Sequence, residues 1–161
     1  MIEPEIRIIG EKKLVGKRMS MSLAADKTHL LWKSFMPLRN QVVNKVNADL
    51  ISLRAYPSNY FEKFDPGAEY EKWALVEVED FVDVPEEMET YILPGGMYAV
   101  FHYKGADNSI FQFIYGEWIS NSGYALDDRP HFEILGEKYR NGDPDSEEEI
   151  WIPIADKKTE I

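Results

Sequence analysis

The residue with the clearest chemical potential is Glu133, in the apolar run from His131 to Leu135 (HFEIL). If this run is a β-strand, its side chains alternate between two faces. Phe132 and Ile134 then share a face that we expect to pack against the helices, whereas Glu133 faces a cleft. A carboxylate in an aromatic-walled site of low dielectric pairs strongly with a cation. The plainer alternative is a solvated strand glutamate, because most glutamates are exposed.

Four aromatic residues are candidate walls of such a cleft. Trp73 and Tyr56 lie on the faces of their predicted strands opposite the small or aliphatic residues. Tyr98 is a third candidate, on a strand whose faces the pattern leaves ambiguous. Trp118 lies on the apolar stripe of a predicted helix, where core packing is the more common role. The four Trp, nine Tyr and eight Phe exceed the needs of a small core, which leaves room for an aromatic binding surface. The alternative is an aromatic-rich core, which is the more common role for any one of these residues.

Other kinds of chemistry find no support in the residue pattern. The chain has no Cys, which excludes a disulfide framework and thiol chemistry. Its three histidines, His29, His102 and His131, show no metal-ligand spacing. There is neither a GxSxG motif nor a phosphate-binding loop. We therefore expect no metal site and no cofactor.

The charge balance restricts the partners. Eighteen Lys and Arg oppose twenty-nine Asp and Glu, giving a net charge of -11. Phosphate backbones repel such a surface, so we expect no nucleic-acid binding by this chain alone. An acidic field favours a small cationic ligand or a basic protein partner. The N-terminal residues lack an apolar stretch long enough for a signal or a membrane span, which predicts a cytoplasmic protein without membrane contact.

The order of predicted elements repeats once along the chain. A strand, a helix and two strands are followed by the same series, with an extra strand at 88–93 between them. We expect Gly10 to bend the first strand and Pro37 to kink or split the first helix. The predicted strands span 5–16, 50–56, 70–81, 89–105 (two strands around a turn at 94–96), 129–135 and 148–154, and the predicted helices span 28–46 and 107–120.

This order indicates an α+β fold in one domain over residues 1–161. We predict two strand-helix-strand-strand modules in a pseudo-two-fold arrangement. Their antiparallel sheets carry helices on one face and leave a ligand cleft on the other.

Several segments together resemble the GyrI-like small-molecule-binding, or effector-binding, domain family. These are EYEKWALVEV at 69–78, PGGMYAVFHYKG at 94–105, EWISNSGYALDDRPHFEIL at 117–135 and IWIPI at 150–154. No single motif is specific, but their order and spacing span about residues 1–155. The resemblance implies the same two-module fold with a cleft between the modules. It also implies that Glu133 lies at the base of a pocket that receives cationic, aromatic ligands.

The resemblance leaves more than one function open. The family includes the effector-binding halves of multidrug-sensing transcription regulators and stand-alone relatives. Because no helix-turn-helix segment precedes the domain, we expect a stand-alone binding protein for a lipophilic, drug- or toxin-like molecule. The alternatives are a hydrolase of cyclopropane-type alkylating toxins, with Glu133 as general base, and an interaction protein that shields gyrase. The ligand and the oligomeric state stay open.

Overall fold

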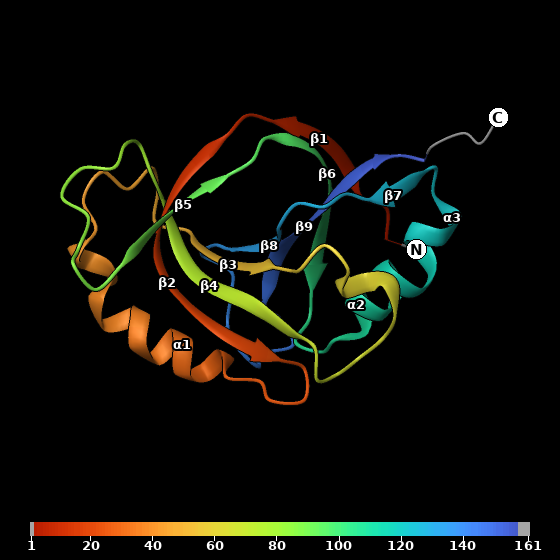
Figure 1. Ribbon diagram of the computed structural model, residues 1–161, viewed down its shortest axis with the longest axis horizontal. Coiled ribbons are helices and arrows are strands. Elements are labelled where there is room, and N and C mark those ends of the chain that lie inside the picture. Colours follow the sequence, from red (N-terminus) through yellow and green to blue (C-terminus); the bar gives the residue numbers. More distant parts are fainter. Residues whose placement is uncertain (1, 158–161) are drawn as a thin grey trace.

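A strongly curved antiparallel sheet forms the frame of the protein (Figure 1). The computed structural model describes residues 2–157. Every strand pair in the sheet is antiparallel. Across the sheet the order is β1 (Glu5–Ile9), β6 (Gly96–Lys104), β9 (Glu147–Asp156), β8 (His131–Leu135), β3 (Leu50–Ala55), β4 (Glu69–Val78), β2 (Lys12–Ser22) and β5 (Glu89–Leu93), and β7 (Tyr124–Leu126) pairs with β9.

The sheet consists of two similar halves that meet at β3 and β8. One half contains β2, β3 and β4, and the other contains β6, β8 and β9. Strands β1 and β5 are exchanged between the halves, since β1 pairs with β6 and β5 pairs with β2. This arrangement confirms the predicted α+β class and the repeated module. It also places β3 and β8 next to each other at the centre of the molecule.

Each half carries one helical segment on the same face of the sheet. The first is α1 (Thr28–Phe35), continued by the 3-10 turn η1 (Met36–Gln41). Pro37 lies at the start of η1, so it splits the predicted helix as expected from its missing N–H. The second is α2 (Ser109–Phe113), which passes through the π-helical turn η3 (Ile114–Trp118) into α3 (Ile119–Asn121).

The face of the sheet without helices encloses an apolar core. Phe132 packs there with Tyr98 and Trp151, at ring-centroid distances of 5.5 and 5.2 Å. The buried residues of this interior core are Leu14, Ile51, Leu53, Trp73, Leu75, Leu93, Tyr98, Val100, Phe132 and Trp151. The helices cover the opposite face, where α1 packs on Ala74 and Val76 and α2 packs on Phe101 and Ile150.

The curvature brings the two connections between the halves into contact. The chain passes from β1 to β2 through Gly10 and from β5 to β6 through Gly95 (Figure 1). A Cβ atom at Gly95 would lie 2.7 Å from the carbonyl oxygen of Ile9. Only a glycine allows so close an approach of two backbones.

The structure refines several sequence boundaries. The predicted strand 5–16 is two strands. The first strand ends before Gly10 and pairs with β6, whereas the second pairs with β4. The short strand β7 and the 3-10 turn η2 (Tyr60–Glu62) lie within segments that the sequence indicates as loops. The last strand, predicted at 148–154, is slightly longer and spans Glu147–Asp156. Among residues 2–157, no helix has both the length and the apolar character that a membrane span requires.

Candidate ligand site between the two helices

Arg54 and Glu133 form a nearly buried ion pair at the centre of the sheet. Arg54 Nη2 donates a hydrogen bond of 2.6 Å to Glu133 Oε2, and the two side chains are only 12% and 11% exposed. The strand register explains the contact, since Arg54 lies opposite His131 and Ser52 lies opposite Glu133. Charge-assisted pairs of this kind are short and strong when water is excluded.

Glu133 points to the face that carries the helices, and this corrects one step of the sequence argument. We expected Phe132 and Ile134 to face the helices. Phe132 instead belongs to the interior core, while Ile150, the cross-strand neighbour of Glu133, packs under α2. Period-2 alternation separates the two faces correctly, but on a curved sheet both faces are covered and the pattern does not tell which one carries helices.

Aromatic rings from the segment after β3 cover this part of the sheet. Phe61 stacks on His131 and on Tyr115, with centroids 5.3 and 5.7 Å apart. Tyr56 contacts Tyr70 and His131, each at 5.1 Å. Phe61 itself is 46% exposed, so a half-exposed ring forms the outer cover of the site. A surface hollow of about 580 Å³ is lined by the same segment, from Pro57 to Glu69.

The guanidinium group of Arg54 is held against aromatic faces. Its Cζ lies 5.2 Å from the ring centre of Phe111 on α2 and 6.0 Å from that of Tyr56. Such cation-π contacts hold the guanidinium in place while leaving donors available. Among the described residues, the buried Nε of Arg54 has no hydrogen-bond partner.

A second pair of charged groups belongs to the same cluster. Burial raises the pKa of Glu148 to about 7, and the negative charge of Glu133 adds to this effect. Burial lowers the pKa of Lys72, with a further contribution from the charge of Arg54. Lys72 Nζ donates a hydrogen bond of 3.0 Å to Thr28 Oγ1 at the start of α1. The cluster therefore holds two acidic and two basic groups.

Two uncharged groups complete the site on the side of α2. Burial lowers the pKa of His131 well below its usual value, so the ring is neutral near pH 7. His131 Nδ1 shares a hydrogen bond of 2.8 Å with the hydroxyl group of Tyr115. Tyr115 lies within the π-helical turn η3, and such turns are frequent at functional sites.

The structure brings only part of the predicted site together. Tyr56 lies beside Arg54 and His131, as a wall of the Glu133 site requires. Trp73 and Tyr98 are buried in the interior core, on the other face of the sheet. They do not share a cleft with Glu133 in this conformation, and their contact with a ligand stays a prediction.

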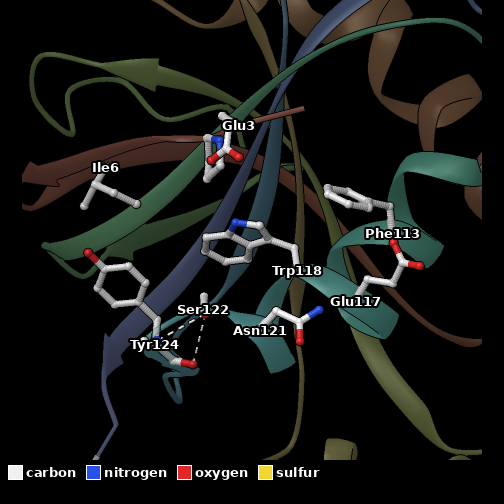
Figure 2. Close-up of a pocket in the computed structure, with 10 residues that line it drawn as sticks. Glu3, Ile6, Phe113, Glu117, Trp118, Asn121, Ser122 and Tyr124 are labelled. Carbon is white, nitrogen blue, oxygen red and sulfur yellow. Dashed lines mark hydrogen bonds between the residues drawn. The ribbon is translucent and has the colours of Figure 1, made fainter. Parts of the chain in front are cut away.

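Trp118 lines a different hollow, of about 490 Å³, between β1 and the α2–α3 segment (Figure 2). Its ring packs edge-on against Phe101 at 5.1 Å and stacks with Tyr124 at 6.3 Å. Glu3 and Glu117 also line this hollow. The core contact with Phe101 agrees with the packing role that the helix stripe indicated.

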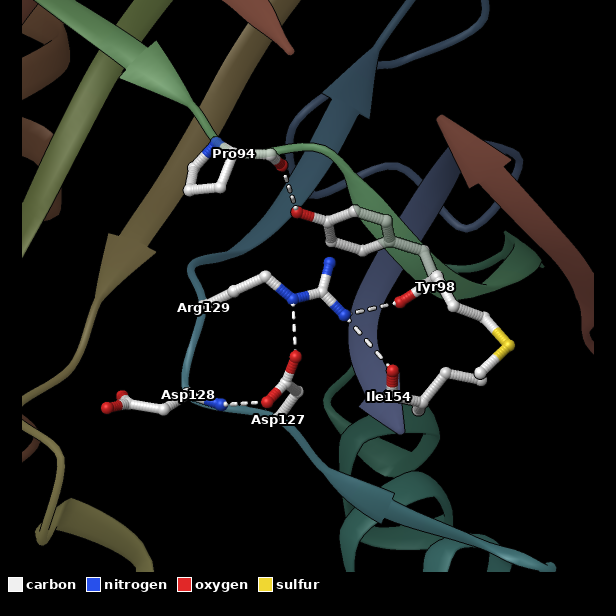
Figure 3. Close-up of polar contacts among 7 residues, drawn as sticks. Pro94, Tyr98, Asp127, Asp128, Arg129 and Ile154 are labelled. Atoms are coloured by element: carbon white, nitrogen blue, oxygen red, sulfur yellow. Dashed lines mark hydrogen bonds and ion pairs between the residues drawn. The ribbon is translucent and has the colours of Figure 1, made fainter. Parts of the chain in front are cut away.

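Arg129, of the run RPHFE, acts as an internal connector (Figure 3). Its Nη2 donates hydrogen bonds of 2.7 and 3.0 Å to the carbonyl oxygens of Met97 and Ile154, and its Nε donates one of 2.7 Å to Asp127. The guanidinium lies 4.6 Å from the ring centre of Tyr98. Arg129 thus joins the segment before β8 to β6 and β9 and fixes the start of the strand that carries Glu133.

Sequence reasoning missed Arg54, Lys72 and Glu148. A signal for Arg54 was present, because the alternation of β3 puts Ser52, Arg54 and Tyr56 on one face. No local signal identified Glu148, which lies in an acidic run and becomes half-buried only through the pairing of β9. Lys72 also lacked a local signal, since its burial depends on α1 packing over β4.

The fold is that of an effector-binding domain of the GyrI-like type. Sequence comparison agrees: the profile of the family described as integron-associated effector binding protein (Cass2) matches residues 5–154. The chain belongs to this family.

One curated relative is the transcriptional regulator BrlR of Pseudomonas aeruginosa, which is 28% identical over 145 residues. The match covers 88% of this chain and 51% of BrlR, so the chain spans about half the length of that relative.

Two solved structures show the same fold. One is the integron cassette protein VCH_CASS2 from the mobile metagenome of Vibrio cholerae, with a TM-score of 0.65, 15% identity, and coverage of 95% of this chain and 96% of that protein. The other is SAV2435 bound to tetraphenylphosphonium, with a TM-score of 0.63, 20% identity, and coverage of 95% and 94%. Small-molecule binding by the effector-binding class is consistent with the site described above.

Proposed function

We propose that this chain binds an aromatic small molecule between its two helices, at the Arg54–Glu133 pair. The observation that carries the proposal is a carboxylate–guanidinium pair, nearly buried, beneath a cover of aromatic rings. Buried charges are retained at a fold's centre at a cost in desolvation, and perturbed ionisable groups cluster at functional sites. The family and the tetraphenylphosphonium complex of SAV2435 support the same type of ligand.

Ligand entry requires the aromatic cover to move. Phe61 occupies the position against His131 and Tyr115 that a flat ligand ring would take. The ring is 46% exposed, and its segment borders a hollow on the protein surface. The displacement of Phe61 costs little free energy, because the ligand restores the stacking that Phe61 gives up.

The test compares charged and neutral probes on a variant of the acidic residue. Glu133→Gln removes the charge, keeps the shape and leaves Arg54 without its ion partner, so affinity for tetraphenylphosphonium should fall by at least about tenfold, or ~1.4 kcal/mol. Triphenylphosphine oxide, a neutral analogue, should lose much less. The control is Glu77→Gln, since Glu77 pairs with Lys12 near the edge of the interior core. If calorimetry shows that Glu133→Gln and Glu77→Gln bind the charged probe equally well, the site assignment is wrong.

A second candidate function is hydrolysis of a strained electrophile at the same place. A general base needs a pKa near the working pH, and Glu148, with a pKa of about 7, meets this condition. Glu133, which the sequence indicated as the base, is instead held by Arg54. Formation of a product that Glu148→Gln abolishes, while binding persists, would establish the enzymatic alternative; its absence across cyclopropane-type substrates leaves the binding function.

A further inference from the structure

We propose that Arg54 sets the ligand class of this site, and that the preferred ligand is an aromatic molecule carrying a negatively charged group. This inference rests on the proposed function, because it specifies the ligand of the same site. It departs from the expectation that Glu133 selects a cation. The reason lies in the pairing of Glu133 and in the donors that surround it.

The local charge of the site differs from the charge of the whole protein. The chain carries a net charge of -11, yet the cluster between the helices contains Arg54 and Lys72 alongside Glu133 and Glu148. Glu148 is only partly ionised at neutral pH, because its pKa is raised to about 7. The cluster is therefore not negative near pH 7, and electrostatic attraction for a cation is weak where the ligand would bind.

A cationic ligand would have to replace Arg54 as the partner of Glu133. Arg54 already makes a 2.6 Å hydrogen bond to that carboxylate. Its guanidinium also lies 5.2 and 6.0 Å from the ring centres of Phe111 and Tyr56, so displacing it would give up these contacts as well. Displacing it would leave an unpaired buried charge, which is strongly unfavourable. A ligand cation placed beside an unmoved Arg54 would be repelled in a medium of low dielectric.

An anionic ligand meets the opposite situation. The buried Nε of Arg54 has no hydrogen-bond partner among the described residues. Guanidinium groups bind carboxylate and similar oxyanions through two parallel N–H donors. Arg54 can keep its bond to Glu133 through Nη2 and still offer a donor to a ligand. Once Phe61 has moved aside, the rings of His131 and Tyr115 that it covers accept the flat part of the molecule.

The experiment uses two probes of the same shape and opposite charge, tetraphenylborate and tetraphenylphosphonium. Their dissociation constants are measured by calorimetry for the wild-type chain, Arg54→Met and Arg18→Met. Arg18 is an exposed residue whose ion partners are Glu71 and Glu89, so its variant loses the same charge away from the site. We expect the wild type and Arg18→Met to bind the borate at least about tenfold more tightly, a difference of ~1.4 kcal/mol. In Arg54→Met the order should reverse, because Glu133 is then free to attract the phosphonium.

Two further variants keep the proposal testable if Arg54→Met folds poorly. Arg54→Lys keeps the charge and should keep the preference for the borate. Glu133→Gln leaves Arg54 unopposed and should increase that preference. If the wild type binds the phosphonium more tightly than the borate, the assignment of ligand class is wrong while the binding site stands. If neither probe binds the wild type, the proposed function fails and this inference fails with it.

Discussion

Phe61 and His131 stack with ring centroids 5.3 Å apart and planes inclined by only 21°, although almost half of Phe61 is exposed to solvent. A half-exposed ring over a buried polar cluster is the arrangement of a cover that a ligand can displace. Phe61 therefore competes with a ligand for the surface of His131 and Tyr115.

Phe61→Ala should tighten the binding of tetraphenyl probes by about 1 kcal/mol, the value of one aromatic pair that the ligand no longer has to break. The free energy of unfolding should fall by a similar amount, about 1 kcal/mol, because the unliganded protein loses the same stacking. Calorimetry and urea unfolding measure the two quantities. Phe64→Ala is the matched control, since Phe64 lies in the same segment and is 82% exposed. Weaker binding by Phe61→Ala than by Phe64→Ala would mean that Phe61 holds the ligand instead of covering its site.

Glu148 should make the stability of the protein depend on pH. Burial raises its pKa from the usual 4.5 to about 7, so the folded state favours the neutral carboxyl group. The stabilisation linked to this group is fully present below about pH 4.5 and is lost as the pH rises through about 7. The charged and titratable groups that act on it or respond to it are Glu133, Arg54, Lys72, Tyr139 and Tyr103.

Glu148→Gln mimics the neutral carboxyl group and should therefore be more stable than the wild type at pH 8 but not at pH 4.5. The urea midpoint of each protein at both pH values gives the answer. Glu147→Gln is the control, because Glu147 is the exposed preceding residue and pairs only distantly, at 3.8 Å, with Lys138. An equal gain for both variants at pH 8 would show that reduced net charge, and not the burial of Glu148, stabilises the fold.

Arg129→Met should destabilise the protein by ~3 kcal/mol, because it removes the donors of two carbonyl oxygens and the ion partner of Asp127. Arg140→Met, at an exposed position, should change stability by less than about 0.5 kcal/mol. Chemical denaturation measures both. Comparable stability of the two variants would refute the connector role of Arg129 seen in Figure 3.

Much of the fold follows from local patterns in the sequence. The alternation in β3, β4 and β8 separated the two faces of the sheet correctly, and Pro37 split the first helix as its chemistry requires. The face that each side chain occupies in three dimensions did not follow. Glu133 was assigned to a helix-free cleft, because the pattern does not show that the sheet curls around Phe132 and Trp151.

The candidate site depends on contacts between distant parts of the chain. Glu133 was identified through a motif resemblance, and Tyr56 through strand alternation. The partner of Glu133 is 79 residues away in sequence, and only the pairing of β3 with β8 brings Arg54 to it. Phe61 was hidden in a segment without periodicity. The site is therefore assembled by long-range strand register and by loop packing, and a local sequence pattern carries no information on either.

The most direct test of the proposed ligand site is a crystal structure of this chain with whichever tetraphenyl probe binds more tightly. We expect the probe to lie between α1 and α2, in contact with His131 and Tyr115, with Phe61 moved from its present stacking position. A probe located instead in the hollow lined by Trp118 and Tyr124 (Figure 2), or within the interior core around Trp73 and Tyr98, would contradict the central claim that the Arg54–Glu133 pair marks the ligand site.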